Sequence, residues 1–132
     1  MGQNPSFVAN GDINPRRFVM MAADFRVAQA TANAAIIGVS QNFSRLYNDP
    51  LCAKAGENCP TYGLGDVCEI VAGAAIAVGD RLKSDANGKA IKADAAALTL
   101  QNLGGVALQA ASAADEVIRI QIINATYNNG IA

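Results

Sequence analysis

Short runs of apolar residues, separated by Gly, Asn and Asp, recur along most of the chain. The clearest run is residues 117–123 (VIRIQII), where isoleucines alternate with Arg119 and Gln121. A period of two is typical of a strand with one buried face. Similar short runs cover residues 18–21, 25–29, 36–39, 67–71, 81–84, 90–92 and 105–108. Many short strands joined by such turns predict an all-β protein, either a small β-barrel or a β-sandwich.

Residues 81–92 predict a β-hairpin, because Asn87-Gly88 is typical of a two-residue turn between two strands. Residues 94–101 (DAAALTLQ) are the one helical candidate. Asp94 would cap a helix there, but the segment is short and Thr99 disfavours it, so a helical turn and a non-helical segment both stay open. The predicted core consists of Val39, Val67, Ile70, Leu82, Ile118, Ile120 and Ile122.

The two halves of the chain share a similar order of segments. Residues 18–27 align without a gap with residues 82–91, and further matches follow: 38–40 with 105–107, then 67–70 with 117–120. The alignment predicts two related hairpin units, although any two meanders of short strands would share part of this similarity. It also isolates residues 41–64 as an insertion in the first half. A loop this long is usually functional or disordered, so we expect it at the surface and dispensable to the fold.

The ends of the chain are polar. Residues 1–15 contain repeated turn signals and predict an extended arm outside the core, followed by a single β domain at 16–123 and a tail at 124–132. The arm would dock on a neighbouring subunit and its deletion would leave the fold intact; the alternative is a loose terminus. Its apolar residues are the candidate anchors: Phe7, Val8 and Ile13.

Charge and composition exclude several functions. Lys and Arg number 10 against 11 Asp and Glu, so the net charge of −1 argues against binding to nucleic acid or to an anionic membrane. The chain has no His, which excludes Ser-His-Asp and Cys-His catalysis and histidine metal ligands. We therefore expect no enzyme, no metal and no cofactor. No segment predicts a membrane span or a signal peptide, so synthesis in the cytoplasm is expected.

Three cysteines are present, two of them in the insertion. Cys52 and Cys59 could form a disulfide under oxidising conditions or remain free thiols, and both alternatives stay open. Structural zinc is not expected, because only Cys68 could add a further sulfur ligand. Cys68 aligns with Ile118 and is expected to be a buried core residue. The candidate partner contacts in the insertion are Tyr47, Leu51 and Tyr62.

Several segments together resemble the phage capsid cement, or head decoration, proteins. They are residues 9–19 (ANGDINPRRFV), 37–42 (IGVSQN), 75–90 (AIAVGDRLKSDANGKA) and 105–113 (GVALQAASA) with 116–120 (EVIRI). The resemblance covers most of residues 9–123, whereas the insertion departs from the family's compact pattern. It implies a β-rich structural protein, assembled as a homotrimer on the outer surface of the virion. Such a protein would bind the major capsid protein and stabilise contacts between capsomers.

Two other classes of function stay open. One is a different virion component, such as a tail, fibre or baseplate subunit, or a head decoration that binds carbohydrate. The absence of Trp and an aromatic content of 5% count against stacking on sugars. The other is a small enzyme with a cysteine nucleophile, which the absence of His disfavours.

Overall fold

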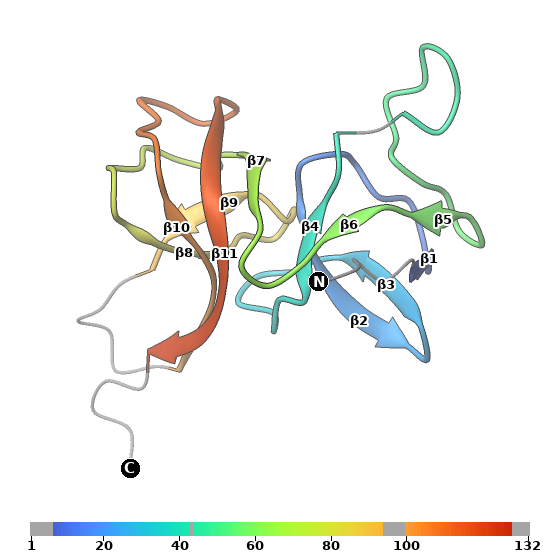
Figure 1. The fold of residues 1–132 in the computed structure, drawn as a ribbon, viewed down its shortest axis with the longest axis horizontal. Helices are drawn as coiled ribbons and strands as arrows, with labels where there is room; N and C mark the ends of the chain where they lie inside the picture. The colour runs from blue at the N-terminus through green and yellow to red at the C-terminus, as the bar shows by residue number, and fades with distance from the viewer. Residues whose placement is uncertain (1–6, 43, 94–99, 128–132) are drawn as a thin grey trace.

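The chain forms two β-sheets that lie side by side in a computed structural model, which describes residues 7–42, 44–93 and 100–127 (Figure 1). These residues form eleven strands and no helix. The predicted all-β class, a small barrel or sandwich built from two hairpin units, is confirmed. Of the helical candidate at 94–101, residues 94–99 lie outside the described residues, and Gln101 begins a strand.

The first sheet has six strands in the order β5-β1-β3-β2-β4-β6. Its centre is the hairpin of β2 and β3, and β1 pairs with β3 in parallel while the other pairs are antiparallel. The edge strands β5 and β6 are only two residues long. The strands are β1 (Phe7–Ala9), β2 (Phe18–Ala23), β3 (Arg26–Gln29), β4 (Gly38–Ser40), β5 (Asn58–Cys59) and β6 (Thr61–Tyr62).

The second sheet has five antiparallel strands in the order β7-β11-β10-β8-β9. The longest strand, β11, pairs with β10 on one side and with β7 on the other. It also runs through Tyr127, beyond the predicted end of the β domain at residue 123. The strands are β7 (Val67–Val71), β8 (Arg81–Ser84), β9 (Ala90–Lys92), β10 (Gln101–Ala107) and β11 (Val117–Tyr127).

The predicted hairpin at 81–92 is confirmed, but its turn is longer than two residues. Ser84 pairs with Ala90, and the Asp85 N–H donates to the carbonyl of Lys89 (2.9 Å), so three residues form the tip. Gly88 adopts a left-handed conformation there (φ 77°), which glycine tolerates best. The Asp85 carboxylate also accepts hydrogen bonds from the Asn87 and Lys89 backbone N–H groups, which explains the extra residue.

The larger hydrophobic core joins the two sheets. Phe18, Ala30 and Val39 of the first half pack there with the isoleucines of β7 and β11. The predicted core is confirmed for six of its seven members, and Cys68 is also buried. Val67 is the exception, with 55% of its surface exposed, because the alternation along β7 turns Cys68 and Ile70 inward and Val67 outward.

A second, smaller core belongs to the first sheet alone. It contains Phe7 and Ile13, so the prediction that these side chains lack a core in their own chain is wrong. The insertion also contributes to it, so the prediction that this segment is dispensable surface is wrong for its second half. The physical reason is pairing between distant segments: β1 lies between β3 and β5, and Ile13 bridges to Ala53. The members are Phe7, Ala9, Ile13, Val19, Val27, Cys52, Ala53 and Cys59.

Candidate interaction surfaces

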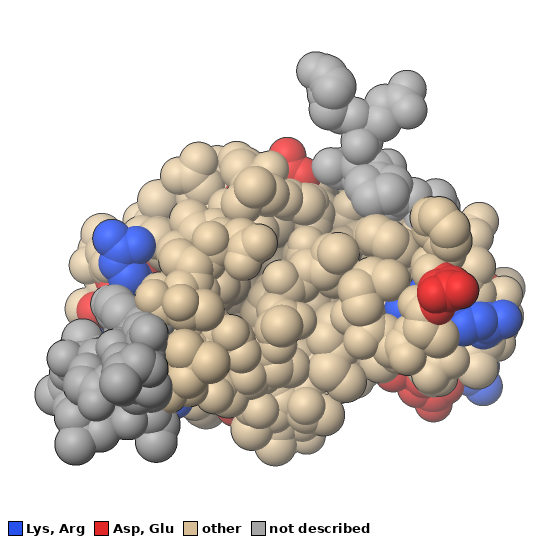
Figure 2. Space-filling view, turned by 90° about the horizontal axis from the view of Figure 1, so that it is seen from below, with Lys and Arg blue, Asp and Glu red and all other residues tan. Residues whose placement is uncertain are grey.

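A set of exposed apolar side chains lies on one side of the molecule. They come from the β2–β3 hairpin, the residue before β4 and the β6–β7 connection, and we call this surface the apolar face. Phe25 and Leu64 are the most exposed members, at 74% and 71%. Figure 2 shows this side, where charged side chains lie at the margins and the centre is uncharged. Exposed apolar patches of this kind mark contact surfaces. The members are Met21, Phe25, Ile37 and Leu64.

Two hollows open on the apolar face and share Phe7 and Ile37 in their walls. The first has a volume of about 300 Å³ and continues to Leu64 and the Ile122–Asn124 part of β11. The second, wider and shallower, has a volume of about 610 Å³ and lies beside the β2–β3 hairpin. Among the lining residues of both, Asp24 is the only charged one. The hollows therefore suit an apolar, uncharged partner surface.

Gly38 sets the wall of the first hollow. A Cβ atom at this position would collide with the backbone carbonyl of Tyr62 and approach the side chain of Thr61. The absence of a side chain lets β4 and β6 pair closely, with Val39 opposite Tyr62. Tyr62 is thereby held against the larger core and forms part of the wall.

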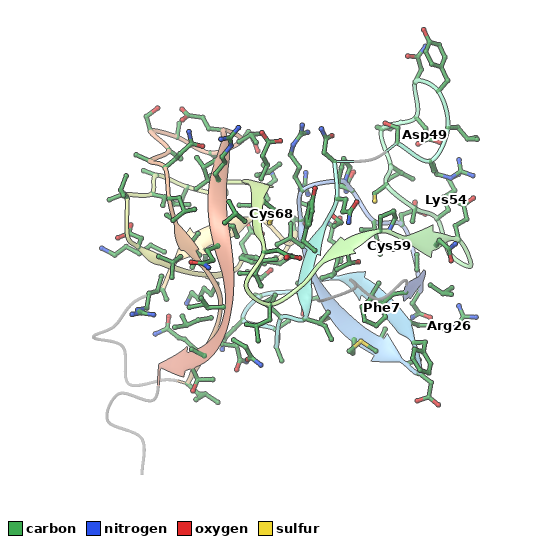
Figure 3. The ribbon with its side chains drawn as sticks, in the orientation of Figure 1. Phe7, Arg26, Asp49, Lys54, Cys59 and Cys68 are labelled. Atoms are coloured by element: carbon green, nitrogen blue, oxygen red, sulfur yellow. The ribbon has the colours of Figure 1, made fainter. Side chains whose placement is uncertain are left out.

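A second exposed surface is the loop of residues 44–51, which projects beyond β5 and β6; Figure 3 labels Asp49 within it. Tyr47 is 95% exposed and Leu46 is 58% exposed. A turn holds them outward, because the Asp49 N–H donates to the Leu46 carbonyl (3.0 Å). Asn48 occupies the left-handed region (φ 61°), which asparagine tolerates better than most residues. We call this segment the 44–51 loop.

Ion pairs fix the base of the 44–51 loop. The Arg45 guanidinium donates to both carboxylate oxygens of Glu57 (Nε–Oε1 2.6 Å, Nη2–Oε2 2.5 Å) and to Asp49 (Nη1–Oδ2 2.7 Å). The hydrogen bond from Arg45 lowers the pKa of Glu57 to about 2. The Leu51 N–H, followed by Arg45, lowers the pKa of Asp49. Two-pronged guanidinium–carboxylate contacts fix orientation, so the loop presents Tyr47 in a set geometry.

The three cysteines fall into two environments. Cys52 and Cys59 are buried together in the smaller core, and Cys68 lies in the larger one. All three are free thiols. Burial, with the nearby Asp66 and Glu69 charges, raises the pKa of Cys68 to about 12, so this thiol is a poor nucleophile.

No metal site is apparent among the described residues, since no three His, Cys, Asp or Glu side chains gather closely enough to hold an ion. In the same part of the chain, there is no helix of the length and apolar character that a membrane span requires.

The structure separates the six predicted contact residues. Phe7 and Ile13 are buried in the chain's own core, so they are not free anchors. Val8, Leu51 and Tyr62 are half-buried, and Tyr62 lines the first hollow. Tyr47 alone is fully presented to solvent. Cys52 and Cys59 do lie together, as the disulfide alternative requires, but they are unbonded.

The apolar face was not predicted from the sequence. Phe25 begins the predicted strand at residues 25–29, and its only signal of exposure is that it directly follows the turn residue Asp24. Leu64 lies between two glycines and gave a similar signal. Met21 and Ile37 gave none, because each sits within an apolar run that predicts a buried strand.

A family model described as phage cement protein matches residues 2–122 of the chain. The chain belongs to this family. It is therefore a structural component of the phage virion that associates with the capsid. The resemblance seen in the sequence is confirmed, and the match extends across the 41–64 segment.

Among solved structures, the chain is similar to the N base of the head fibre protein gp8.5 of bacteriophage phi29. The two share 17% identity with a TM-score of 0.52, over 89% of this chain and 90% of that one. At this identity the likeness shows a shared fold. None of the curated proteins compared with the chain matches it.

Proposed function

We propose that this phage cement protein is a capsid decoration protein. It binds the outer surface of the head and stabilises contacts between capsomers of the major capsid protein. The observation that carries the proposal is the apolar face, an exposed surface with two hollows in which Asp24 is the only charged lining residue, on a member of this family. Burying such a surface against the shell supplies binding energy without any chemistry.

The energetic role is linkage between binding and assembly. A ligand that binds only the assembled shell stabilises that shell by mass action. Each copy needs only a modest contact, because many copies act on one lattice and linked contacts reinforce one another. Phe25 and Leu64 are the expected hot spots, since large apolar side chains that enter a partner's pocket dominate interface energies.

The homotrimer is part of the same proposal. The 44–51 loop and the apolar face are separate surfaces from different elements, so one protomer has two places to contact its surroundings. We assign the apolar face to the capsid and the 44–51 loop to a neighbouring copy. Tyr47 suits the second contact, since an exposed tyrosine can bury a large area while few rotatable bonds become fixed.

Binding to purified heads tests the capsid contact. Phe25→Ser should weaken co-sedimentation with heads about 30-fold, the equivalent of a hot-spot loss of about 2 kcal/mol. Val78→Ser is the matched control, because Val78 is an exposed valine (67%) outside the apolar face. Equal binding of both variants would overturn the assignment of the surface. Failure of the unaltered protein to bind heads would overturn the function.

Native mass measurement tests the trimer. The unaltered protein should be trimeric, whereas Tyr47→Ala should shift it towards monomer without changing its folding. A monomer both in solution and on heads would contradict the homotrimer.

A second candidate function is the base of a head fibre, and the likeness in fold to the phi29 head fibre base favours it. Electron microscopy of heads with bound protein separates the two. A decoration protein covers the lattice as a compact layer, whereas a fibre base carries a long projection supplied by further chain or a partner.

A further inference from the structure

Two thiols meet in the smaller core beside the 44–51 loop. Cys52 and Cys59 have no exposed surface and pack in the same small cluster, where their thiols lie close enough to interact. The Thr61 hydroxyl also lies 3.9 Å from the Cys59 sulfur. Nothing in the family assignment requires two adjacent sulfur atoms at this position.

Both cysteines are held by backbone pairing from the N-terminal segment. The Cys52 N–H donates to the carbonyl of Ile13 (2.8 Å), and Cys59 pairs with Phe7 across β1 and β5. The eight residues from 52 to 59 therefore form a closed excursion with fixed ends. A turn at its tip, where the Glu57 N–H donates to the Lys54 carbonyl (2.9 Å), keeps the ends close.

We propose that Cys52 and Cys59 form an intrachain disulfide once the protein meets an oxidising medium, and that this bond locks the base of the 44–51 loop. Arg45 and Glu57 already join the 44–51 loop to residues 52–59 by an ion pair. That ion pair is partly exposed, with 19% and 39% of the two side chains accessible, so salt can screen it, whereas the sulfur atoms lie in the core. The disulfide would be the covalent counterpart of the ion pair.

A small disulfide such as oxidised glutathione is the oxidant. The Cys59 thiolate attacks one sulfur of oxidised glutathione, so that a mixed disulfide forms between Cys59 and one glutathione and the S–S bond of the oxidant breaks. The departing glutathione thiolate takes up the proton that Cys59 released. The Cys52 sulfur, losing its own proton, then attacks Cys59 and expels the second glutathione, which takes up that proton. Two protein thiols are oxidised, and one glutathione disulfide is reduced to two thiols.

The order of the two steps follows from the hydrogen bond between the thiols. The hydrogen bond from Cys52 lowers the pKa of Cys59, and the thiolate is the attacking species. Cys52 is the donor, so its own pKa is raised. Because both sulfurs are covered, the first step requires transient opening of residues 52–59. Formation of the bond is therefore slow and late.

Mass spectrometry of the full chain tests the bond. The protein is incubated with oxidised glutathione, unfolded without reduction and alkylated. The expected result is complete loss of alkylation at Cys52 and Cys59, with Cys68 still alkylated and a mass lower by two hydrogens before alkylation. Alkylation of all three cysteines, a glutathione retained on Cys59, or cross-linked dimers would each overturn the proposal.

Variants separate the bond from accidental protection. Cys52→Ala should retain one glutathione on Cys59, because no second thiol is left to expel it, whereas Cys68→Ala should leave the Cys52–Cys59 bond unchanged. Trypsin cleavage after Arg45 or Lys54 should slow on oxidation of the unaltered protein and be indifferent to oxidation in Cys52→Ala. Equal cleavage of the oxidised and reduced forms would overturn the role of the bond at the loop.

The bond does not depend on the proposed function. Co-sedimentation with heads is measured in both redox states. Absence of binding in both states would reject the capsid function and leave the disulfide standing. Binding to heads without formation of the bond would reject the disulfide and leave the capsid function standing.

Discussion

The two sheets contain the same three-stranded unit in different surroundings. In the first sheet the β2–β3 hairpin pairs with β4, and in the second the β8–β9 hairpin pairs with β10. The third strand lies beside the first arm of the hairpin in both units, with Phe18 opposite Val39 and Leu82 opposite Gly105. These units are the ones that align in the sequence.

The fourth strand of each unit differs. In the second sheet β11 pairs with β10, but its sequence counterpart β7 does not pair with β4. β7 pairs with β11 instead, with Ile70 opposite Ile118. The place beside β4 is taken by β6, and the far side of the first sheet by β1 and β5.

The 41–64 segment is therefore a structural replacement. It supplies β5, β6 and part of the smaller core, and it also carries the exposed 44–51 loop and two cysteines. The first sheet is built from segments distant in sequence, whereas the second is built mainly from neighbours. The difference shows that a repeated hairpin can be completed in two ways, and that the unusual features gather in the irregular one.

Deletion of residues 2–13 should produce the largest effect and should act on the first sheet. Phe7 and Ile13 are buried, and truncation of either to Ala is expected to cost about 2–5 kcal/mol. The deletion removes both side chains and also the pairing of β1 with β3 and β5. The first sheet should therefore no longer fold cooperatively. Two-dimensional NMR would show collapse of signals from β2 and β3. An unchanged spectrum and unfolding midpoint would restore the picture of an independent arm.

Ile120→Ala tests the second sheet and should cost about 2–5 kcal/mol in free energy of unfolding. Ile120 is fully buried in the first half of β11, and a Cβ added at Gly105 would lie 2.7 Å from its Cδ1 atom, so the packing is tight. Arg119→Ala is the matched control on the exposed face of the same strand and should change stability by less than about 0.5 kcal/mol. Denaturant unfolding measures both, and similar losses would contradict the alternation along β11.

The predictability of each part follows from how local its pattern is. The alternation of β11 and the 81–92 hairpin were correctly predicted because their partners lie nearby in sequence. The N-terminal segment was misjudged because the partner of β1 is β3, in parallel, and the partner of Ile13 is Ala53. Neither pairing leaves a periodic signal, since residues 7–9 are too short a run to count as a strand.

The candidate surfaces were harder to predict than the fold. Tyr47 could be predicted as a contact because it lies in a long insertion and is apolar enough to pack on another surface. The apolar face depends on which side of β2 and β4 the second sheet covers. That arrangement follows from β7, which pairs with β11 in the second sheet and not with β4. The contact of Cys52 with Cys59 also depends on β1, which pairs with β5.

Ser40→Ala should have an intermediate effect and compares the units directly. Ser40 aligns with Ala107, so the substitution gives the first unit the residue of the second. The buried Ser40 hydroxyl accepts from the Arg17 N–H (3.0 Å) and donates to the Asn14 carbonyl (2.6 Å). Leaving those groups unpaired should cost about 1–3 kcal/mol, measured by denaturant unfolding. Ser112→Ala, at an exposed serine, is the control, and an equal change in both would contradict the structural role of Ser40.

Glu57→Gln should have the smallest effect on global unfolding and a visible one on the 44–51 loop. The pKa of Glu57 is held at about 2 in the fold against an ordinary value of 4.5. A carboxylate with a lowered folded-state pKa contributes stability above its ordinary pKa and loses it as the pH falls towards the lowered value. The Arg45–Glu57 contact should therefore be intact above pH 4.5 and weaken between pH 4.5 and 2.

An NMR titration of the Arg45 side chain and the Tyr47 ring measures this loosening. In the unaltered protein both signals should shift together as Glu57 takes up its proton, with a midpoint near pH 2, and raised salt should reduce the size of the shift. In Glu57→Gln the loop should already be loosened at pH 7. The matched control is Asp115→Asn in the second sheet, which removes the ion pair with Lys89 and should leave the Tyr47 signal unchanged. If Tyr47 responded equally to both substitutions, the loop would not be held by its own ion pairs, and the covered sulfurs of Cys52 and Cys59 with the backbone pairing of Ile13 would be its principal anchor.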